Sequence, residues 1–253
     1  SGMSLDEYRL LLLEMCKVFI NGDVRIDEVD RFGRVHTPVT RLPTELRQCL
    51  SIGGKTLVNI DLANSQPLIA GIVAANYYRN RTAALRLRDR KFTDGSNPYH
   101  RRTPVSVETD RDDLRAYLKI CEDGQLYESV MHDGDDRDRI KKQFLTMMYG
   151  KNGYRSGLMA RFTESYPSVA KMLKDVKRKN YRHAAHLMQN VESTIFIHVI
   201  CRRIMDERPS VPVLTIHDSI LTTPESVTYV ESVIMDEFGK LGITPTLHQD
   251  PYE

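Results

Sequence analysis

One stretch of the chain combines residue types that suit phosphate and base binding. Four of its side chains recur at every fourth position: Arg137, Lys141, Leu145 and Tyr149. On a helix, this spacing gives one slowly drifting stripe. Two cations, an aliphatic residue and then a phenol suit a triphosphate whose base stacks at the far end. An ordinary solvent-exposed helix face is the alternative interpretation, and the flanking residues must decide between the two.

The same stretch carries the boundaries and the core face of a helix. Acidic residues stand before it, where the helix dipole favours them: Asp133, Asp135 and Asp136. Gly150 and Gly153 follow it and predict its end. Apolar residues lie largely on the side opposite the stripe and predict a core face: Ile140, Phe144, Met147 and Met148.

A carboxylate follows a predicted strand upstream of this helix. Residues 56–60 are apolar and β-branched, are preceded by two glycines, and lead directly to Asp61. A carboxylate at the end of a buried strand is costly unless it is hydrogen-bonded or binds a cation. Capping of the apolar helix predicted over 68–75 is the other interpretation of Asp61.

A second carboxylate follows an apolar strand near the C-terminus. Residues 211–216 predict a strand, His217 and Asp218 lie in a turn, and 220–223 predict the returning strand of a hairpin. Two aspartates on neighbouring strands can bridge two divalent metals roughly 3.5–4 Å apart, an arrangement used for in-line phosphoryl displacement. We therefore expect Asp61 and Asp218 to hold two Mg²⁺ or Mn²⁺ ions, with Lys141 near a leaving pyrophosphate.

Three further features suit nucleic acid, each with a structural alternative. Gly33 and Arg34 place a glycine and a cation at the tip of a predicted turn. The cation suits nucleic acid, and an ordinary surface turn is the alternative interpretation. Residues 79–102 mix cations with aromatic rings, which suits a nucleic-acid backbone with stacked bases or a solvated charged segment. Gln189 and Glu192 interrupt an otherwise apolar helix over 182–205 and need partners, either structural or a ligand.

The bulk composition sets limits on the class of protein. The chain has 253 residues, 28% charged and 41% hydrophobic, as in ordinary globular proteins. A net charge of +2 means that any affinity for nucleic acid must come from local patches. Four widely spaced cysteines predict reduced thiols in the cytoplasm. No apolar run is long enough for a membrane span and no signal peptide is visible, so we expect no membrane partner.

The order of these elements resembles the palm and fingers of family A DNA polymerases and the related single-subunit RNA polymerases. Arg137, Lys141 and Tyr149-Gly150 resemble the fingers-helix motif, and residues 141–150 are closest to its RNA polymerase version. Residues 61–66, Asp-Leu-Ala-Asn-Ser-Gln, resemble the first palm motif, and His217-Asp218 resembles the last one. The likeness runs from about residue 30 to about residue 223.

The resemblance implies a template-directed nucleotidyltransferase that adds nucleotides to a primer 3′-hydroxyl. It implies catalytic and metal-binding roles for Asp61 and Asp218, with Lys141 also catalytic. It implies a nucleotide site made of Arg137, Lys141, Leu145, Tyr149 and Gln66. It implies contacts with the primer–template nucleic acid from Arg34, Gln189 and His217.

Departures from the family pattern leave the nucleotide sugar open. Asn64, Ser65 and Gln66 occupy the region where the DNA polymerases carry a glutamate that excludes ribonucleotides. Ser219 follows His217-Asp218 as in the RNA polymerases, whereas the spacing from Arg34 to Asp61 is that of the DNA enzymes. We therefore weigh a DNA polymerase using dNTPs against a primase or RNA polymerase using NTPs. From another class, a catalytically silent palm serving as a nucleic-acid-binding or assembly module is the alternative.

The resemblance also implies an architecture. We expect an α+β fold in which an antiparallel palm sheet contains the 56–61 strand and the 211–223 hairpin. The expected divisions are an N-terminal helical segment over 1–29, a palm over 30–67 and 181–253, and fingers over 68–180. The segment before Gly33 is short for a thumb, so an accessory subunit or a missing N-terminal region is expected to supply that function. This matches the compact family A relatives of phages and mobile elements.

Overall fold

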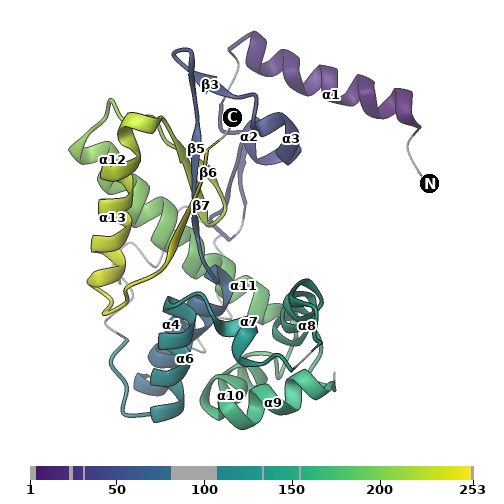
Figure 1. Cartoon of the computed structure of the whole chain (residues 1–253), viewed down its shortest axis with the longest axis vertical. Helices are drawn as coiled ribbons and strands as arrows, with labels where there is room; N and C mark the ends of the chain where they lie inside the picture. Colours follow the sequence, from purple (N-terminus) through teal and green to yellow (C-terminus); the bar gives the residue numbers. More distant parts are fainter. Residues whose placement is uncertain are drawn as a thin grey trace.

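A computed structural model describes residues 4–22, 25–30, 32–80, 107–132, 134–153 and 155–251 of the chain. These residues form a mixed fold of helices and small antiparallel sheets, which confirms the predicted α+β class (Figure 1). Most of the basic segment predicted to contact nucleic acid, from residue 81 onward, lies outside the described residues. No helix in the described ranges is long and apolar enough to cross a membrane.

The largest sheet has four antiparallel strands in the order β6-β7-β5-β8. Its strands are β5 (Val58–Leu62), β6 (Leu214–Ile216), β7 (Ser219–Thr222) and β8 (Leu247–Pro251). The predicted strand before Asp61, the predicted hairpin and a C-terminal edge strand are therefore all present. Thr56 was expected in the first of these strands but belongs to β4 (Lys55–Thr56), because a two-glycine turn folds this segment back onto β3 (Ser51–Ile52).

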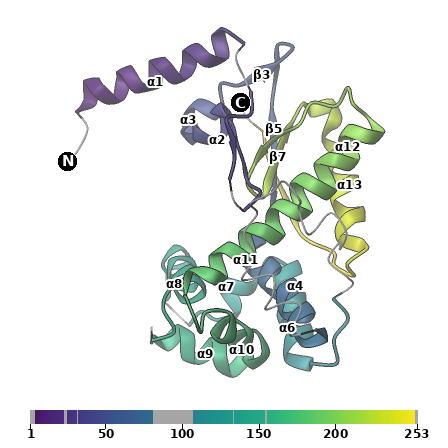
Figure 2. The same ribbon diagram turned by 180° about the vertical axis from the view of Figure 1, so that it is seen from behind.

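The two faces of the sheet have different environments. Along β5, Val58, Ile60 and Leu62 are buried in the main core, whereas Asn59 and Asp61 alternate with them and are only half-buried. Helices cover the core face, namely α11 (Arg182–Ser193), η2 (Thr194–Cys201), α12 (Arg202–Glu207) and α13 (Val227–Gly239), the last preceded by the short η3 (Pro224–Ser226). The first three of these form one continuous helical run, which crosses in front of the sheet in the view of Figure 2.

A helical region lies beyond one end of the sheet, in the lower part of Figure 1. It contains α4 (Ser65–Arg79), α6 (Asp112–Glu122), α7 (Leu126–Ser129), α8 (Arg137–Tyr149), α9 (Gly157–Ser165) and α10 (Pro167–Val176). Pro167 begins α10 and so separates it from α9. Helix α11 packs against both α4 and α8 and so links this region to the sheet.

Helix α8 has the limits that the sequence predicts. The Asp136 side chain caps it by accepting a hydrogen bond from the backbone N–H of Arg139 at 3.0 Å. Gly150 ends it, and a side chain could not replace that glycine easily, because an added Cβ would lie 2.5 Å from the carbonyl oxygen of Thr146. The predicted core face is buried: Ile140, Phe144, Met147 and Met148.

The N-terminal elements lie around the other end of the sheet. They are α1 (Leu5–Ile20), β1 (Glu28–Val29), β2 (Val35–His36), α2 (Pro38–Arg41) and α3 (Thr44–Arg47). The sequence predicts α1 as a packing helix, but it extends away from the body of the molecule in both views (Figures 1 and 2). Several large apolar side chains are exposed along it: Tyr8, Leu10, Leu11, Leu13 and Ile20. Its apolar spacing predicted the helix but not a partner surface.

Candidate active site

The two predicted aspartates lie at the same end of adjacent strands. Asp61 of β5 stands directly opposite Ser219 of β7, and Asp218 immediately precedes Ser219 in the hairpin turn. Burial, together with the charge of the Asp218 carboxylate, raises the pKa of Asp61 to about 6. The capping interpretation of Asp61 is wrong, because α4 begins at Ser65 with Asn64 at the cap position.

The hairpin turn that carries Asp218 has an unusual backbone. His217 has a φ of +56°, in the left-handed region that few residues other than glycine adopt. The strand residues on either side of the turn, Ile216 and Ser219, are paired with each other, so the turn contains only His217 and Asp218. Burial lowers the pKa of His217, and Arg34 lowers it as well. His217 is therefore favoured as a neutral side chain.

The donor set of the two aspartates fits a hard divalent cation. Mg²⁺ prefers carboxylate oxygens, and proteins often supply only one or two of them while water and substrate phosphates complete the shell. The electrostatic effect of Asp218 on Asp61 shows that the two carboxylates are near neighbours, so a bound cation would relieve their repulsion. No cluster of three or more metal-ligating side chains occurs among the described residues, so the fit is to a two-carboxylate site.

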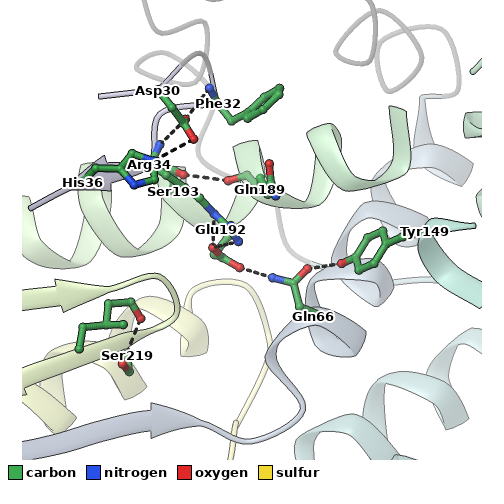
Figure 3. A network of polar contacts seen from close by, with 11 residues as sticks. Asp30, Phe32, Arg34, His36, Gln66, Tyr149, Gln189, Glu192, Ser193 and Ser219 are labelled. Atoms are coloured by element: carbon green, nitrogen blue, oxygen red, sulfur yellow. Dashed lines mark hydrogen bonds and ion pairs between the residues drawn. The ribbon is translucent and has the colours of Figure 1, made fainter. Parts of the chain in front are cut away.

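A chain of hydrogen bonds joins the turn that holds Arg34 to helices α11, α4 and α8 (Figure 3). Arg34 donates from Nε at 2.9 Å and from Nη2 at 2.6 Å to Oε1 of Glu192 on α11. Gln66, in the first turn of α4, donates from Nε2 to the other oxygen of that carboxylate. Tyr149, the last residue of α8, donates its hydroxyl hydrogen to Oε1 of Gln66. We call these four residues the polar chain.

The turn before β2 is built to aim Arg34 at α11. Asp30 organises the turn by accepting hydrogen bonds from the backbone N–H groups of Phe32 at 2.8 Å and Arg34 at 3.1 Å. Gly33 has a φ of +80°, and an added Cβ would lie 3.4 Å from Cβ of Ser193 on α11. The Phe32 ring stacks on His186 of α11 with centroids 4.4 Å apart. The predicted surface turn is thus docked on a helix.

Burial governs the electrostatics of the polar chain. The Glu192 side chain is 1% exposed, and burial raises its pKa to about 7 even though Arg34 opposes the shift. Burial also raises the pKa of the Tyr149 phenol, with the Glu192 carboxylate acting in the same direction. Asp218 contributes to both shifts, so the polar chain and the aspartates lie within electrostatic reach of each other.

The predicted stripe on α8 begins exposed and ends in the polar chain. Lys141 is exposed and Leu145 is half-buried. Arg137 is half exposed, pairs with Glu128 through Nε at 2.5 Å, and lies over the Tyr127 ring at 5.3 Å. Only Tyr149 is drawn into the site by direct contacts. The other three stripe residues lie on the same helix, α8, before Tyr149.

A cavity opens on the half-buried face of the sheet that carries Asn59 and Asp61, although neither Asp61 nor Asp218 lines it. Its volume is about 420 Å³, and it is lined by Thr44, Arg47, Gln48, Asn59, Ile216, Ser219 and Asp250. Two buried polar atoms, Nε of Arg47 and Oδ1 of Asn59, lack a hydrogen-bond partner within the described residues. Such groups are costly to bury, so the cavity suits a polar ligand. Gln189 lies outside this cavity, half-buried on α11 next to the docked turn (Figure 3).

Sequence reasoning missed two titratable neighbours of the site and the partners of a third. It flagged Glu192 as needing a partner but could not identify Arg34 and Gln66 as those partners. It also left out His248 and Asp250 of β8, which stand opposite Asp61 and Asn59 on β5. The strand Leu247–Pro251 has no alternation of apolar and polar residues that could have marked it, and the register that brings His248 to Asp61 depends on tertiary pairing.

Comparisons with known proteins add no family to this geometry: no protein-family model matches the chain, and no curated protein matches it.

Proposed function

We propose that the chain is a template-directed nucleotidyltransferase of the family A polymerase type, with the sheet as palm and the helical region as fingers. The hydrogen bond from Tyr149 to Gln66 carries the proposal. It joins the end of the α8 stripe to the strand-and-helix motif that begins at Asp61. Two sequence features that were interpreted independently thereby meet at one place, with Asp218 in electrostatic reach of Tyr149.

In this function the exposed face of α8 binds the nucleotide. Lys141 and Arg137 offer cations to a triphosphate, and Leu145 and Tyr149 offer apolar surface and a ring further along the helix. Gln66 accepts a hydrogen bond from the Tyr149 hydroxyl, which fixes the position of the Tyr149 ring. The arrangement orients a nucleotide along α8 with one end directed towards the two aspartates.

Asp61 and Asp218 would hold the divalent cations, which supply Lewis-acid stabilisation of charge on the reacting phosphate and the attacking hydroxyl. The protein contributes carboxylates whose charges are costly in the absence of a cation, as the raised pKa of Asp61 indicates. Arg47 and Gln48 line the cavity on the same sheet face, where a primer strand would contribute phosphate and sugar oxygens.

Primer extension tests the proposal. A labelled primer on a DNA template would be incubated with Mg²⁺ or Mn²⁺ and either dNTPs or NTPs. Growth of the primer that follows the template supports the proposal, and the set of nucleotides used separates a DNA polymerase from a primase or RNA polymerase. The matched controls are Asp218→Asn in the site and Asp206→Asn on the exposed surface of α12. No growth by the folded wild-type protein under any condition would contradict the proposal.

A further inference from the structure

Glu192 stands between the two ligand surfaces that the proposed function assigns, yet it is buried away from both. Its side chain is 1% exposed. One carboxylate oxygen accepts both hydrogen bonds from Arg34, and the other accepts the hydrogen bond from Gln66. A carboxylate inside a protein is tolerated only with such partners, so Glu192 constrains the residues on both sides of it.

On the nucleic-acid side, Glu192 fixes the guanidinium of Arg34. A guanidinium has five N–H donors in a rigid fork, and here Nε and Nη2 both point at one carboxylate oxygen. The Arg34 side chain is 19% exposed, so the group is anchored at one edge while part of it reaches the surface. Anchoring at one edge lowers the side-chain entropy that this cation loses when it meets a phosphate or a base edge.

On the nucleotide side, Glu192 fixes the amide of Gln66. An amide carries donors at one end and an acceptor at the other. Because the donor end faces Glu192, the acceptor end faces the Tyr149 hydroxyl. Without the carboxylate the amide could turn over, and Tyr149 would then face a donor instead of an acceptor. The position of the last ring on the α8 stripe thus depends on Glu192.

We propose that Glu192 is a positioning residue that couples nucleic-acid binding at Arg34 to nucleotide binding at Gln66 and Tyr149. A ligand that orders Arg34 also orders Glu192 and, through it, Gln66 and Tyr149. The second ligand then binds groups that are already ordered, so each ligand strengthens the binding of the other. The identity of the two ligands rests on the proposed function, whereas the coupling itself rests on the polar chain.

The test compares Glu192→Gln and Glu192→Ala with a matched variant, Glu237→Gln. Glu237 is also buried, at 7% exposed, and also accepts a hydrogen bond from an arginine, Nη1 of Arg203 at 2.9 Å. It lies on α13 and has no contact with the polar chain among the interactions of the described residues. In Glu192→Gln the new amide can keep its contact with Arg34 only by presenting a donor to Gln66, so the Gln66 amide must turn over or a hydrogen bond of the polar chain is lost.

The first readout is binding. The Kd of a template annealed to a primer ending in a dideoxynucleotide would be measured with Mg²⁺, with and without the complementary nucleotide. The wild-type protein should bind this duplex more tightly with the nucleotide present. Loss of about 1.4 kcal/mol of coupling would lower this enhancement roughly tenfold in both Glu192 variants. Glu237→Gln should keep the wild-type enhancement.

The second readout separates positioning from loss of folded protein. A positioning defect should raise the nucleotide KM and the duplex Kd together, whereas partial unfolding should lower kcat in proportion to the active fraction and leave KM unchanged. Wild-type enhancement in the Glu192 variants, or an equal loss in Glu237→Gln, would overturn the proposal. If the wild-type protein extends no primer, the proposed function fails, while the binding measurements still decide on the coupling.

Discussion

The two sides of the candidate site differ in how their charged side chains are partnered. On the sheet side, Glu192 is buried and both of its oxygens accept hydrogen bonds, from Arg34 and Gln66. On α8, Lys141 is exposed and Arg137 is half exposed with a single carboxylate partner. The sheet side is therefore preorganised by the protein, whereas the cations of α8 are held mainly by water and await a ligand.

This difference has an energetic consequence. Breaking a buried ion pair by removing one partner commonly costs about 3–5 kcal/mol, because the remaining charge is left in a medium of low polarity. Removing an exposed cation usually changes stability by less than about 1 kcal/mol. Substitution of Arg34 or Glu192 should therefore affect both folding and function, and substitution of an exposed α8 cation should affect function alone. Four predictions test this contrast, beginning with the largest effect.

Asp61→Asn and Asp218→Asn should have the largest effect on activity. Each substitution removes one of the two carboxylates that would hold the cations, so nucleotide incorporation should fall by on the order of a hundredfold to a thousandfold or more. Both variants should nevertheless be at least as stable as the wild type without metal, since each removes repulsion that raises the pKa of Asp61. Primer extension and urea unfolding check the two halves of this prediction. Extension at the wild-type rate by either variant would exclude the assigned role.

Lys141→Ala should reduce nucleotide use without reducing stability. A charge-assisted hydrogen bond to a phosphate contributes about 1.5–3 kcal/mol, so kcat/KM should fall roughly tenfold to a hundredfold. Lys142→Ala is the matched control, because Lys142 is an exposed lysine on the next position of α8 and lies outside the stripe. Equal losses in both variants would mean that the overall charge of the helix matters, and not the stripe.

Tyr149→Phe should have a smaller effect, since it removes only the hydroxyl group that donates a hydrogen bond to Gln66. A buried hydrogen bond contributes about 1 kcal/mol, so the nucleotide KM should rise by roughly fivefold, and stability should fall slightly. Tyr229→Phe is the control, because the Tyr229 hydroxyl also donates to a side chain, at 3.0 Å to Glu207, on the far helices. An unchanged KM in Tyr149→Phe would remove Tyr149 from the nucleotide site.

Lys177 gives a purely structural effect. It is buried, its Nζ donates to the carbonyl oxygen of Met147 in the last turn of α8 at 2.7 Å, and burial lowers its pKa to about 8. The unfolded chain keeps the ordinary value of 10.5, so between pH 8 and 10.5 the unfolded state binds more protons and stability should rise with pH. Urea unfolding should show this rise in the wild type relative to Lys177→Met. An identical pH dependence in both proteins would contradict the assignment.

The local part of the site could be predicted from the sequence. The limits of α8 follow from Asp136 and Gly150, which cap and end the helix through groups only a few residues away. The strand before Asp61 and the hairpin at Asp218 follow from apolar runs bounded by turn residues. These features depend on neighbours in the chain, and sequence patterns report such neighbours directly.

The long-range part could not be predicted. Arg34 and Glu192 are 158 residues apart, and no local pattern specifies that an arginine in a turn pairs with a glutamate in a distant helix. The same holds for His248, which reaches Asp61 only through the register of β8 on β5. For α1 the pattern predicted the helix correctly but not its exposed apolar side chains, because burial requires a partner surface that lies elsewhere in the fold.

The most direct test of the account is templated primer extension by the wild-type protein beside its Asp218→Asn variant, with Mg²⁺ and with dNTPs and NTPs in separate reactions. We predict that the wild type extends the primer by the bases that the template specifies and that the variant does not. A folded wild-type protein that adds no nucleotide of either kind, or a variant that extends as well as the wild type, would contradict it.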